Sequence, residues 1–138
     1  MGRRIMRGTI LVVDDEPDQL EVVKTILSDA GFSVAITTNG FDALKLVDKS
    51  LPGLIIVDAN MPTMNGFALC ESLRRAPATA GIPIIMLTGL TGNLSRMNGL
   101  LHGASAYMTK PYKIDELIAR VNELMKRSAP PSTARSAA

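Results

Sequence analysis

Short apolar runs alternate along the chain with longer stretches in which apolar residues recur every three or four positions. The short runs are rich in β-branched residues, which favours strands, whereas the longer stretches have the period of amphipathic helices. The predicted strands cover residues 9–13, 33–37, 54–57, 82–87 and 106–109. A helical stretch follows each of them, so the pattern predicts a repeated strand–helix unit.

The first and last helical stretches have the clearest apolar faces. Their members are Leu20, Val23, Leu27 and Ala30 in the first, and Ile114, Leu117, Ile118, Val121 and Leu124 in the last. Gly31 is a stop signal after the first helix, and two more helices are predicted over 41–49 and 66–75. The stretch 93–102 contains Asn98 and Gly99. Because Gly costs about 1 kcal/mol relative to Ala within a helix, we expect this element to be the least stable.

Two of the runs, LIIV and IPIIML, are apolar at consecutive positions and have no polar face. Strands of this kind are typical of parallel sheets that are covered on both sides. Right-handed crossovers then place helices on each face of the sheet. The predicted fold is an α/β three-layer sandwich of (βα)5 type, with a five-stranded parallel sheet. In such sheets the functional site lies outside the carboxyl ends of the strands.

Polar residues stand at this edge of the predicted sheet. Asp14 and Asp15 follow the first strand, Asp58 the third, Thr88 the fourth and Lys110 the fifth. Each of them alone is adequately explained as a polar group at the end of a strand, where the backbone meets water. Their convergence on one edge is not explained in that way, and it makes them a candidate site.

Carboxylates that crowd a partly desolvated cleft require positive charge nearby. Lys110 supplies one unit, and Mg²⁺ is the natural candidate for the rest, because it binds oxygen ligands and keeps waters for an incoming phosphate. The sequence has no Walker-type loop and no Cys or Ser beside a general base, and its one histidine, His102, lies far along the chain. What remains is a carboxylate that can attack a phosphoryl group.

Composition narrows the function classes. A chain of 138 residues fits one domain, and the single cysteine, Cys70, which we expect in the core, excludes an internal disulfide. Residues 1–7 and 126–138 hold six of the fifteen basic residues, so the body between them has nine basic and thirteen acidic residues. With no Trp and few Tyr or Phe, it is not expected to bind nucleic acid directly. No apolar stretch is long enough for a membrane span, and we expect a cytoplasmic protein.

Four segments, LVVDDEP, LIIVDANMPTMNG, PIIMLTG and ASAYMTKPY, resemble the motifs of the two-component response regulator receiver domain (CheY-like superfamily) in order and spacing. The resemblance covers about residues 9–125. It implies that Asp58 accepts a phosphoryl group from a histidine kinase or a histidine phosphotransfer protein. It also implies direct Mg²⁺ ligation by Asp15 and Asp58, a further ligand in the backbone carbonyl of Asn60, and contact of Asp14 with the ion through water.

The same resemblance assigns the remaining residues. Lys110, joined to Pro111 by a cis bond, is expected to bind a phosphoryl oxygen, and Thr88 to donate its hydroxyl to the phosphoryl group. Tyr107 is expected to rotate inward as Thr88 moves. The resemblance thereby implies a change in the surface formed by the fourth helix, the fifth strand and the fifth helix. The expected partner is a downstream effector protein or an output domain absent from this chain, and a phosphorylation-dependent dimer is compatible with it.

Three functions compete at this point. The first is a phosphorylation-controlled signalling switch that catalyses only its own phosphorylation and dephosphorylation. The second is a non-phosphorylated pseudo-receiver that serves as a docking scaffold, and the third is a phosphatase with an aspartyl nucleophile, which requires an acid at the position of Asn60. The presence of the whole candidate site favours the switch. We expect a basic N-terminal extension over 1–8, a receiver domain over 9–126, and a disordered tail or linker over 127–138.

Overall fold

The computed structural model describes residues 4–61, 64–89 and 102–127. Its strands are β1 (Arg4–Val13), β2 (Ser33–Thr37), β3 (Ser50–Val57), β4 (Ile84–Thr88) and β5 (Ala106–Thr109). The helices of the described part are α1 (Pro17–Asp29), α2 (Gly40–Lys49), α3 (Gly66–Arg75) and α5 (Ile114–Arg127). The helix predicted over 93–102 lies outside the described residues, apart from His102, which is in a turn. No helix within the described ranges is long and apolar enough to cross a membrane.

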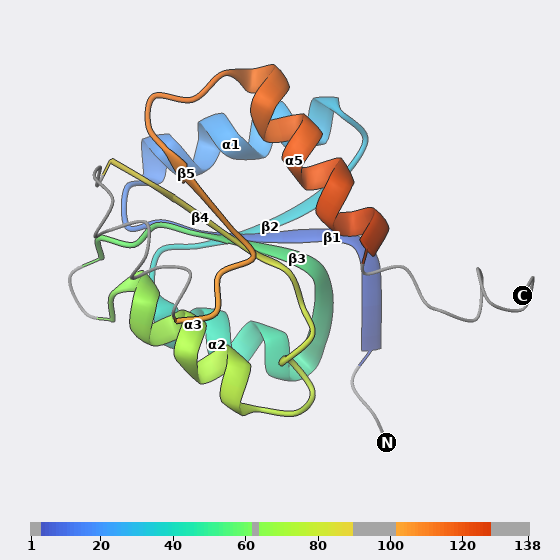
Figure 1. Ribbon diagram of the computed structural model, residues 1–138, viewed down its shortest axis with the longest axis vertical. Coiled ribbons are helices and arrows are strands. Elements are labelled where there is room, and N and C mark those ends of the chain that lie inside the picture. The colour runs from blue at the N-terminus through green and yellow to red at the C-terminus, as the bar shows by residue number, and fades with distance from the viewer. Residues whose placement is uncertain (1–3, 62–63, 90–101, 128–138) are drawn as a thin grey trace, which may run out of the picture.

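All strands belong to one parallel sheet with the order β2-β1-β3-β4-β5. Helices α1 and α5 cover one face of this sheet, and α2 and α3 cover the other (Figure 1). The predicted three-layer α/β sandwich is therefore confirmed. The strand order reverses between β1 and β3, because the chain moves from β1 to one edge of the sheet and from β3 to the other. A crevice forms at the carboxyl ends of strands where the order reverses in this way.

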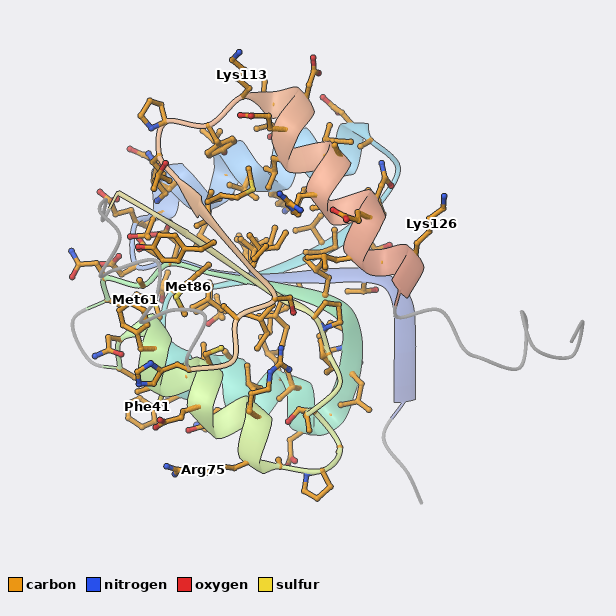
Figure 2. All side chains as sticks on the ribbon, in the orientation of Figure 1. Phe41, Met61, Arg75, Met86, Lys113 and Lys126 are labelled. Carbon is orange, nitrogen blue, oxygen red and sulfur yellow. The ribbon has the colours of Figure 1, made fainter. Side chains whose placement is uncertain are left out.

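The apolar core lies on both faces of the sheet, and β3 contributes to each. Leu54 and Ile56 belong to the cluster under α1 and α5, whereas Ile55 and Val57 belong to the cluster under α2 and α3. All four are at most 1 % exposed, and side chains fill the space between the sheet and both helix layers (Figure 2). Burial of each such side chain stabilises the fold by roughly 2 kcal/mol. Asp58, the residue that follows Val57, therefore stands at the end of a firmly packed strand.

Two strands begin earlier than the sequence predicts. The first is expected from residue 9 and the third from residue 54, but β1 begins at Arg4 and β3 at Ser50. The two early segments pair with each other in parallel. Gly8 and Pro52 interrupt the apolar pattern there, and both residues are read from sequence as strand breakers. Backbone pairing between the segments forms a ladder that the side-chain pattern does not reveal.

Helix ends follow the signals in the sequence. The side chain of Asn39 accepts a hydrogen bond from the backbone N–H of Asp42, and the side chain of Asn65 does the same for Ala68. These are N-caps, which satisfy backbone donors that a helix leaves unpaired. Gly31 follows α1 with a φ of 99°, in the left-handed region that terminates helices. The beginnings of α2 and α3 and the end of α1 are thus locally encoded.

The structure differs from the sequence pattern in three details. Ala30 is exposed at the C-cap of α1, and Ile114, the first residue of α5, is 53 % exposed. Both stand at helix ends, where the apolar period continues although the core does not reach that far. The fourth strand is predicted from residue 82, but β4 begins at Ile84. Pro83 has no N–H for the ladder, and the N–H of Ile82 is used in the preceding turn.

Cys70 is a core residue, as predicted. It lies in α3 with no exposed surface. Burial raises the pKa of its thiol to about 11, although the nearby Arg74 acts in the opposite direction. The thiol therefore stays protonated near neutral pH and serves as a small apolar side chain.

Candidate functional site

Two carboxylates, Asp14 and Asp58, stand at the crevice while their backbones are still bonded to the sheet. The N–H of Asp14 donates to the carbonyl of Thr37 at 3.2 Å, and the N–H of Asp58 donates to the carbonyl of Val13 at 2.9 Å. The two residues are only 6 % and 7 % exposed. Acids anchored in this way cannot easily move apart, so their charges must be balanced where they stand.

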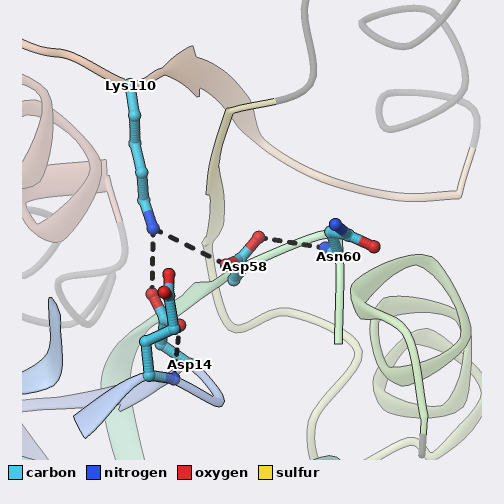
Figure 3. Close-up of polar contacts among 5 residues, drawn as sticks. Asp14, Asp58, Asn60 and Lys110 are labelled. Atoms are coloured by element: carbon cyan, nitrogen blue, oxygen red, sulfur yellow. Dashed lines mark hydrogen bonds and ion pairs between the residues drawn. The ribbon is translucent and has the colours of Figure 1, made fainter. Parts of the chain in front are cut away.

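Each of these carboxylates has one oxygen held by a nearby backbone N–H. Oδ1 of Asp58 accepts from the N–H of Asn60 at 2.9 Å, and Oδ1 of Asp14 accepts from the N–H of Glu16 at 3.0 Å. Their Oδ2 atoms face Lys110, whose Nζ lies 3.0 Å from Asp14 and 3.6 Å from Asp58 (Figure 3). The local turns thus set the rotation of both carboxylates, and Lys110 bridges them.

Lys110 is placed by the end of β5. Its N–H donates to the carbonyl of Thr88 at 2.8 Å, and its bond to Pro111 is cis, as predicted. Burial by itself lowers the pKa of this ammonium, but the hydrogen bond and charge of Asp14 and the charge of Asp58 together outweigh burial and raise the pKa. Lys110 is therefore a permanent positive charge at neutral pH.

The raised pKa of Lys110 has a consequence for stability at alkaline pH. A lysine whose pKa rises on folding stabilises the fold fully below its unfolded pKa of about 10.4, and the contribution is lost as pH rises through the folded pKa. We expect the native chain to exceed Lys110→Met in free energy of unfolding by a constant amount between about pH 7 and pH 10, and by less above it. Urea unfolding at a series of pH values measures this difference. The exposed Lys126, changed to Met, is the control, and a difference for Lys110→Met that already shrinks between about pH 7 and pH 9 contradicts the assignment.

An open cleft of about 490 Å³ lies over these groups. Its lining consists of Asp15, Glu16, Asp58, Asn60, Thr88, Gly89 and Lys110. The structure therefore brings together, from the ends of β1, β3, β4 and β5, most of the residues that the sequence singled out. Asp14 joins the group through its contact with Lys110.

Glu16 is a member of this site that the sequence interpretation missed. Oxygen atoms of Asp14, Glu16 and Asp58 all lie within 4.8 Å of one another. Asp15 lines the cleft but is not part of this cluster. The signal was present in the continuous acidic run DDE of the motif LVVDDEP, but the sequence interpretation gave roles only to its first two residues. Three carboxylates against one ammonium, with an all-oxygen donor set, fit a hard divalent cation such as Mg²⁺.

Tyr107 and His102 lie outside the cleft. Tyr107 packs against the core cluster under α2 and α3, and it pairs in register with Met86 of β4. The Nε2 atom of His102 lies 3.6 Å from Oε2 of Glu71 on α3. The histidine therefore belongs to the α3 side of the molecule and does not supply a general base to the cleft.

The sequence model of the response regulator receiver domain matches residues 10–122. Among curated proteins, the DNA-binding response regulator MtrA of Mycolicibacterium smegmatis is 41 % identical over 123 residues, which are 89 % of this chain and 53 % of that protein. The chain thus spans about half the length of the curated relatives that it matches.

Solved structures of receiver domains have the same fold as this chain. The signal receiver domain of a signal transduction histidine kinase from Syntrophus aciditrophicus has a TM-score of 0.81 at 38 % identity, with 86 % of this chain and 90 % of that chain covered. The chemotaxis protein CheY4 of Vibrio cholerae has a TM-score of 0.80 at 29 % identity, with 89 % and 99 % covered. Because the family model matches most of its length, and the curated relative and the solved structures agree, this chain belongs to the response regulator receiver domain family of two-component signalling.

Proposed function

We propose that this chain is a phosphorylation-controlled switch in which Asp58 accepts a phosphoryl group from the phosphohistidine of a histidine kinase or a phosphotransfer protein. The arrangement around Asp58 carries this proposal. Its carboxylate is buried at the crevice between β1 and β3, its rotation is set by the N–H of Asn60, and its second oxygen faces the ammonium of Lys110. A nucleophile held in one orientation beside a fixed positive charge suits phosphoryl transfer, which depends mainly on positioning and charge compensation.

The chain's own groups have distinct parts in this transfer. A carboxylate oxygen of Asp58 forms the bond to phosphorus while the bond from phosphorus to the donor's imidazole nitrogen breaks, and the nitrogen keeps the electron pair. Lys110, now nearer to Asp14 than to Asp58, moves toward the incoming phosphoryl oxygens, which a compact ammonium on a flexible stem can do. Thr88, in the same cleft, donates its hydroxyl to another phosphoryl oxygen. The chain acts as an enzyme only toward itself, in gaining and in hydrolysing this group.

We assign the Mg²⁺ ion to the acidic side of the cleft. Asp15 and Asp58 would hold it directly, together with the backbone carbonyl of Asn60, and Asp14 would contact it through water. When bound, the ion offsets the charge of the carboxylates and of the phosphoryl oxygens. The excess of carboxylates over ammonium groups in the cluster of Asp14, Glu16 and Asp58 supports a cation on this side of the cleft. Asp15 is assigned from its place in the motif, and it lines the same cleft.

The choice between Asp15 and Glu16 as a ligand is testable by a matched pair of substitutions. We expect Asp15→Asn to weaken Mg²⁺ binding by about tenfold or more, because the substitution removes a charged oxygen ligand. Glu16→Gln is expected to change the affinity by less than about twofold, since it only weakens the surrounding negative potential. Calorimetric titration with Mg²⁺ gives both values. The reverse order would assign the ion to the Asp14, Glu16 and Asp58 cluster instead.

Phosphorylation would act on the rest of the chain through the ends of β4 and β5. The phosphoryl group carries close to two negative charges and draws Thr88 and Lys110 toward itself. Tyr107, on the strand that precedes Lys110, follows the movement of Thr88. The surface of β5 and α5, with the predicted helix over 93–102, would then change its contacts with a partner. We propose that this partner is a downstream effector or an output domain. A phosphorylation-dependent dimer is also compatible with this change of surface.

The proposed domain division follows from this function. Residues 9–126 would form the receiver and 127–138 a tail or linker, and 1–8 would be a basic extension whose residues 4–8 lengthen β1. The relative MtrA is named as a DNA-binding response regulator, and about half of its length matches this chain. An output domain after the receiver is therefore a proposal consistent with that relative. A cytoplasmic location, where the kinase donor is expected, belongs to the same proposal.

The direct test is phosphorylation from a small donor. The native chain, incubated with Mg²⁺ and a small acyl phosphate, is expected to gain the mass of one phosphoryl group, detected by intact mass spectrometry. Peptide mapping should place it between β3 and α3. If neither the adduct nor Mg²⁺ binding is found, the chain is a docking scaffold and the proposed switch is wrong.

A further inference from the structure

One arginine, Arg74, joins three segments of the chain at the end of the sheet opposite to the cleft. It lies in the last turn of α3, and its Nη1 donates to the carbonyls of Ala80 at 3.0 Å and Ile82 at 2.6 Å. Its Nε donates to the carbonyl of Gly103 at 2.8 Å. Ala80 and Ile82 precede β4, and Gly103 precedes β5. Arg74 therefore ties α3 to the entrances of two neighbouring strands.

Ser105 extends this connection directly between the strands. Its hydroxyl accepts the N–H of Ile84, the first residue of β4, at 3.0 Å, and its own N–H donates to the carbonyl of Ile84 at 2.7 Å. The Nη2 atom of Arg74 lies 3.4 Å from the same hydroxyl. The amino ends of β4 and β5 are thus joined by backbone, hydroxyl and guanidinium contacts.

The side chain of Arg74 passes close to the backbone of Gly103, and its donors match the oxygens around it. A Cβ atom added at Gly103, whose φ is 103°, would lie only 2.6 Å from Cγ of Arg74. All four acceptors are uncharged oxygens on two loops, so the interaction depends on the direction of the guanidinium donors more than on its charge. A lysine has the charge but lacks the planar set of donors.

The position of β5 in the sheet makes this connection relevant to the cleft. β5 is an edge strand of four residues, bonded to β4 on one side. Thr88 pairs in register with Thr109, and the N–H of Lys110 bonds to the carbonyl of Thr88. The two groups assigned to the phosphoryl oxygens therefore stand at the carboxyl ends of the same two strands whose amino ends Arg74 joins. A strand of four residues has few ladder bonds, so the contacts just before its first residue add to the few bonds that hold it against β4.

We infer that Arg74 is a positioning residue for phosphoryl binding: by joining the amino ends of β4 and β5, it holds Thr88 and Lys110 where they meet the phosphoryl oxygens. It does not touch the reacting group. The inference rests on the proposed function, because it concerns the phosphoryl part of the site. The inference separates phosphoryl binding from Mg²⁺ binding. Mg²⁺ is assigned to the ends of β1 and β3, and Arg74 does not join those strands.

The test compares two ligands of the same cleft. Beryllofluoride, a phosphoryl mimic, is titrated in saturating Mg²⁺, and Mg²⁺ is titrated alone, on the native chain and on Arg74→Met. We expect Arg74→Met to bind beryllofluoride about tenfold more weakly, in the range of ordinary coupling between separate sites, and to bind Mg²⁺ within about twofold of the native chain. Arg74→Lys should lie closer to Met than to the native chain, because the donor geometry is lost.

The neighbouring Arg75 provides a matched control. It is on the same helix, its side chain is 76 % exposed and points away from the body (Figure 2), and its contact is an ion pair with Glu71 at 3.4 Å. Arg75→Met should leave both affinities unchanged. Thermal unfolding verifies that each variant is folded. If Arg74→Met does not fold, Ser105→Ala, which removes the hydroxyl between the strands, should show the same selective loss to a smaller extent.

Two results would overturn the inference while the proposed function stands. One is native-like beryllofluoride affinity in folded Arg74→Met, or in Ser105→Ala where it replaces that variant. The other is an equal loss of Mg²⁺ and beryllofluoride affinity, which would give Arg74 only a general structural role. A native chain that takes up neither beryllofluoride nor a phosphoryl group contradicts the proposed function itself, and the inference about Arg74 is then wrong with it.

Discussion

Asp58→Asn is expected to take up no phosphoryl group under conditions in which the native chain gains one. The amide lacks the nucleophilic oxygen anion, so no bond to phosphorus forms. Its Oδ1 can still accept the N–H of Asn60, as the carboxylate does at 2.9 Å, so the turn after β3 is preserved. Intact mass spectrometry after incubation with Mg²⁺ and an acyl phosphate measures the effect.

The same substitution should also stabilise the metal-free chain. Asp58 shares one ammonium with Asp14 and lies in a cluster with Glu16, so removal of its charge relieves repulsion. We expect the free energy of unfolding in urea to rise by about 1 kcal/mol without Mg²⁺, a common result where a functional site is held under strain. Asp29→Asn, at an exposed position of α1, is the control and should retain the adduct. An adduct that persists in Asp58→Asn would place the acceptor elsewhere.

Gly66→Ala is expected to lower the free energy of unfolding by about 3 kcal/mol, at the upper end of the range for overpacked sites. A Cβ atom at Gly66 would collide with the carbonyl oxygen of Asp58 and would lie 2.7 Å from Cα of Ala59. Both contacts are with backbone, which cannot rotate away as a side chain can. The N–H of Gly66 also bonds to the carbonyl of Ala59 at 3.0 Å. Any accommodation must therefore displace the turn that carries Asp58.

Gly66→Ala should consequently also slow formation of the phosphoryl adduct. Urea unfolding gives its effect on stability, and the time course of intact mass gives its effect on phosphorylation. Gly81→Ala is a matched control, because a Cβ atom there meets nothing within 4 Å. It should change the free energy of unfolding by less than about 0.5 kcal/mol. Equal stability of the two variants would mean that the turn after β3 adapts freely, contrary to its packing against α3.

Local features of the sequence were enough to predict the architecture and most of the candidate site. Runs such as LIIV have no polar face, and this alone requires a strand covered on both sides, as β3 is. Parallel strands bring their carboxyl ends to one edge, so residues placed directly after them converge without further information. Asp58, Thr88 and Lys110 line one cleft for this reason. The caps at Asn39 and Asn65 are local for a different reason, because their partners stand three residues away.

Other features depend on distances between segments that are far apart in the chain. Lys110 lies nearer to Asp14 than to Asp58, although 96 positions separate it from Asp14. Glu16 joins the carboxylate cluster, although the run DDE by itself does not distinguish its members. No periodicity indicates that Arg74 joins the entrances of β4 and β5.

The sequence by itself determined the layers of this protein, the edge of the sheet where the candidate site lies and the residue types available there. Only the tertiary structure decided which carboxylate lies nearer to the ammonium, which acid completes the cluster and which arginine joins the two strands at their opposite ends. The physical reason is that burial depends on residue type and period, which one strand or helix displays alone. A hydrogen bond or ion pair depends on a few tenths of an ångström between atoms of separate elements, and only their packing sets that distance.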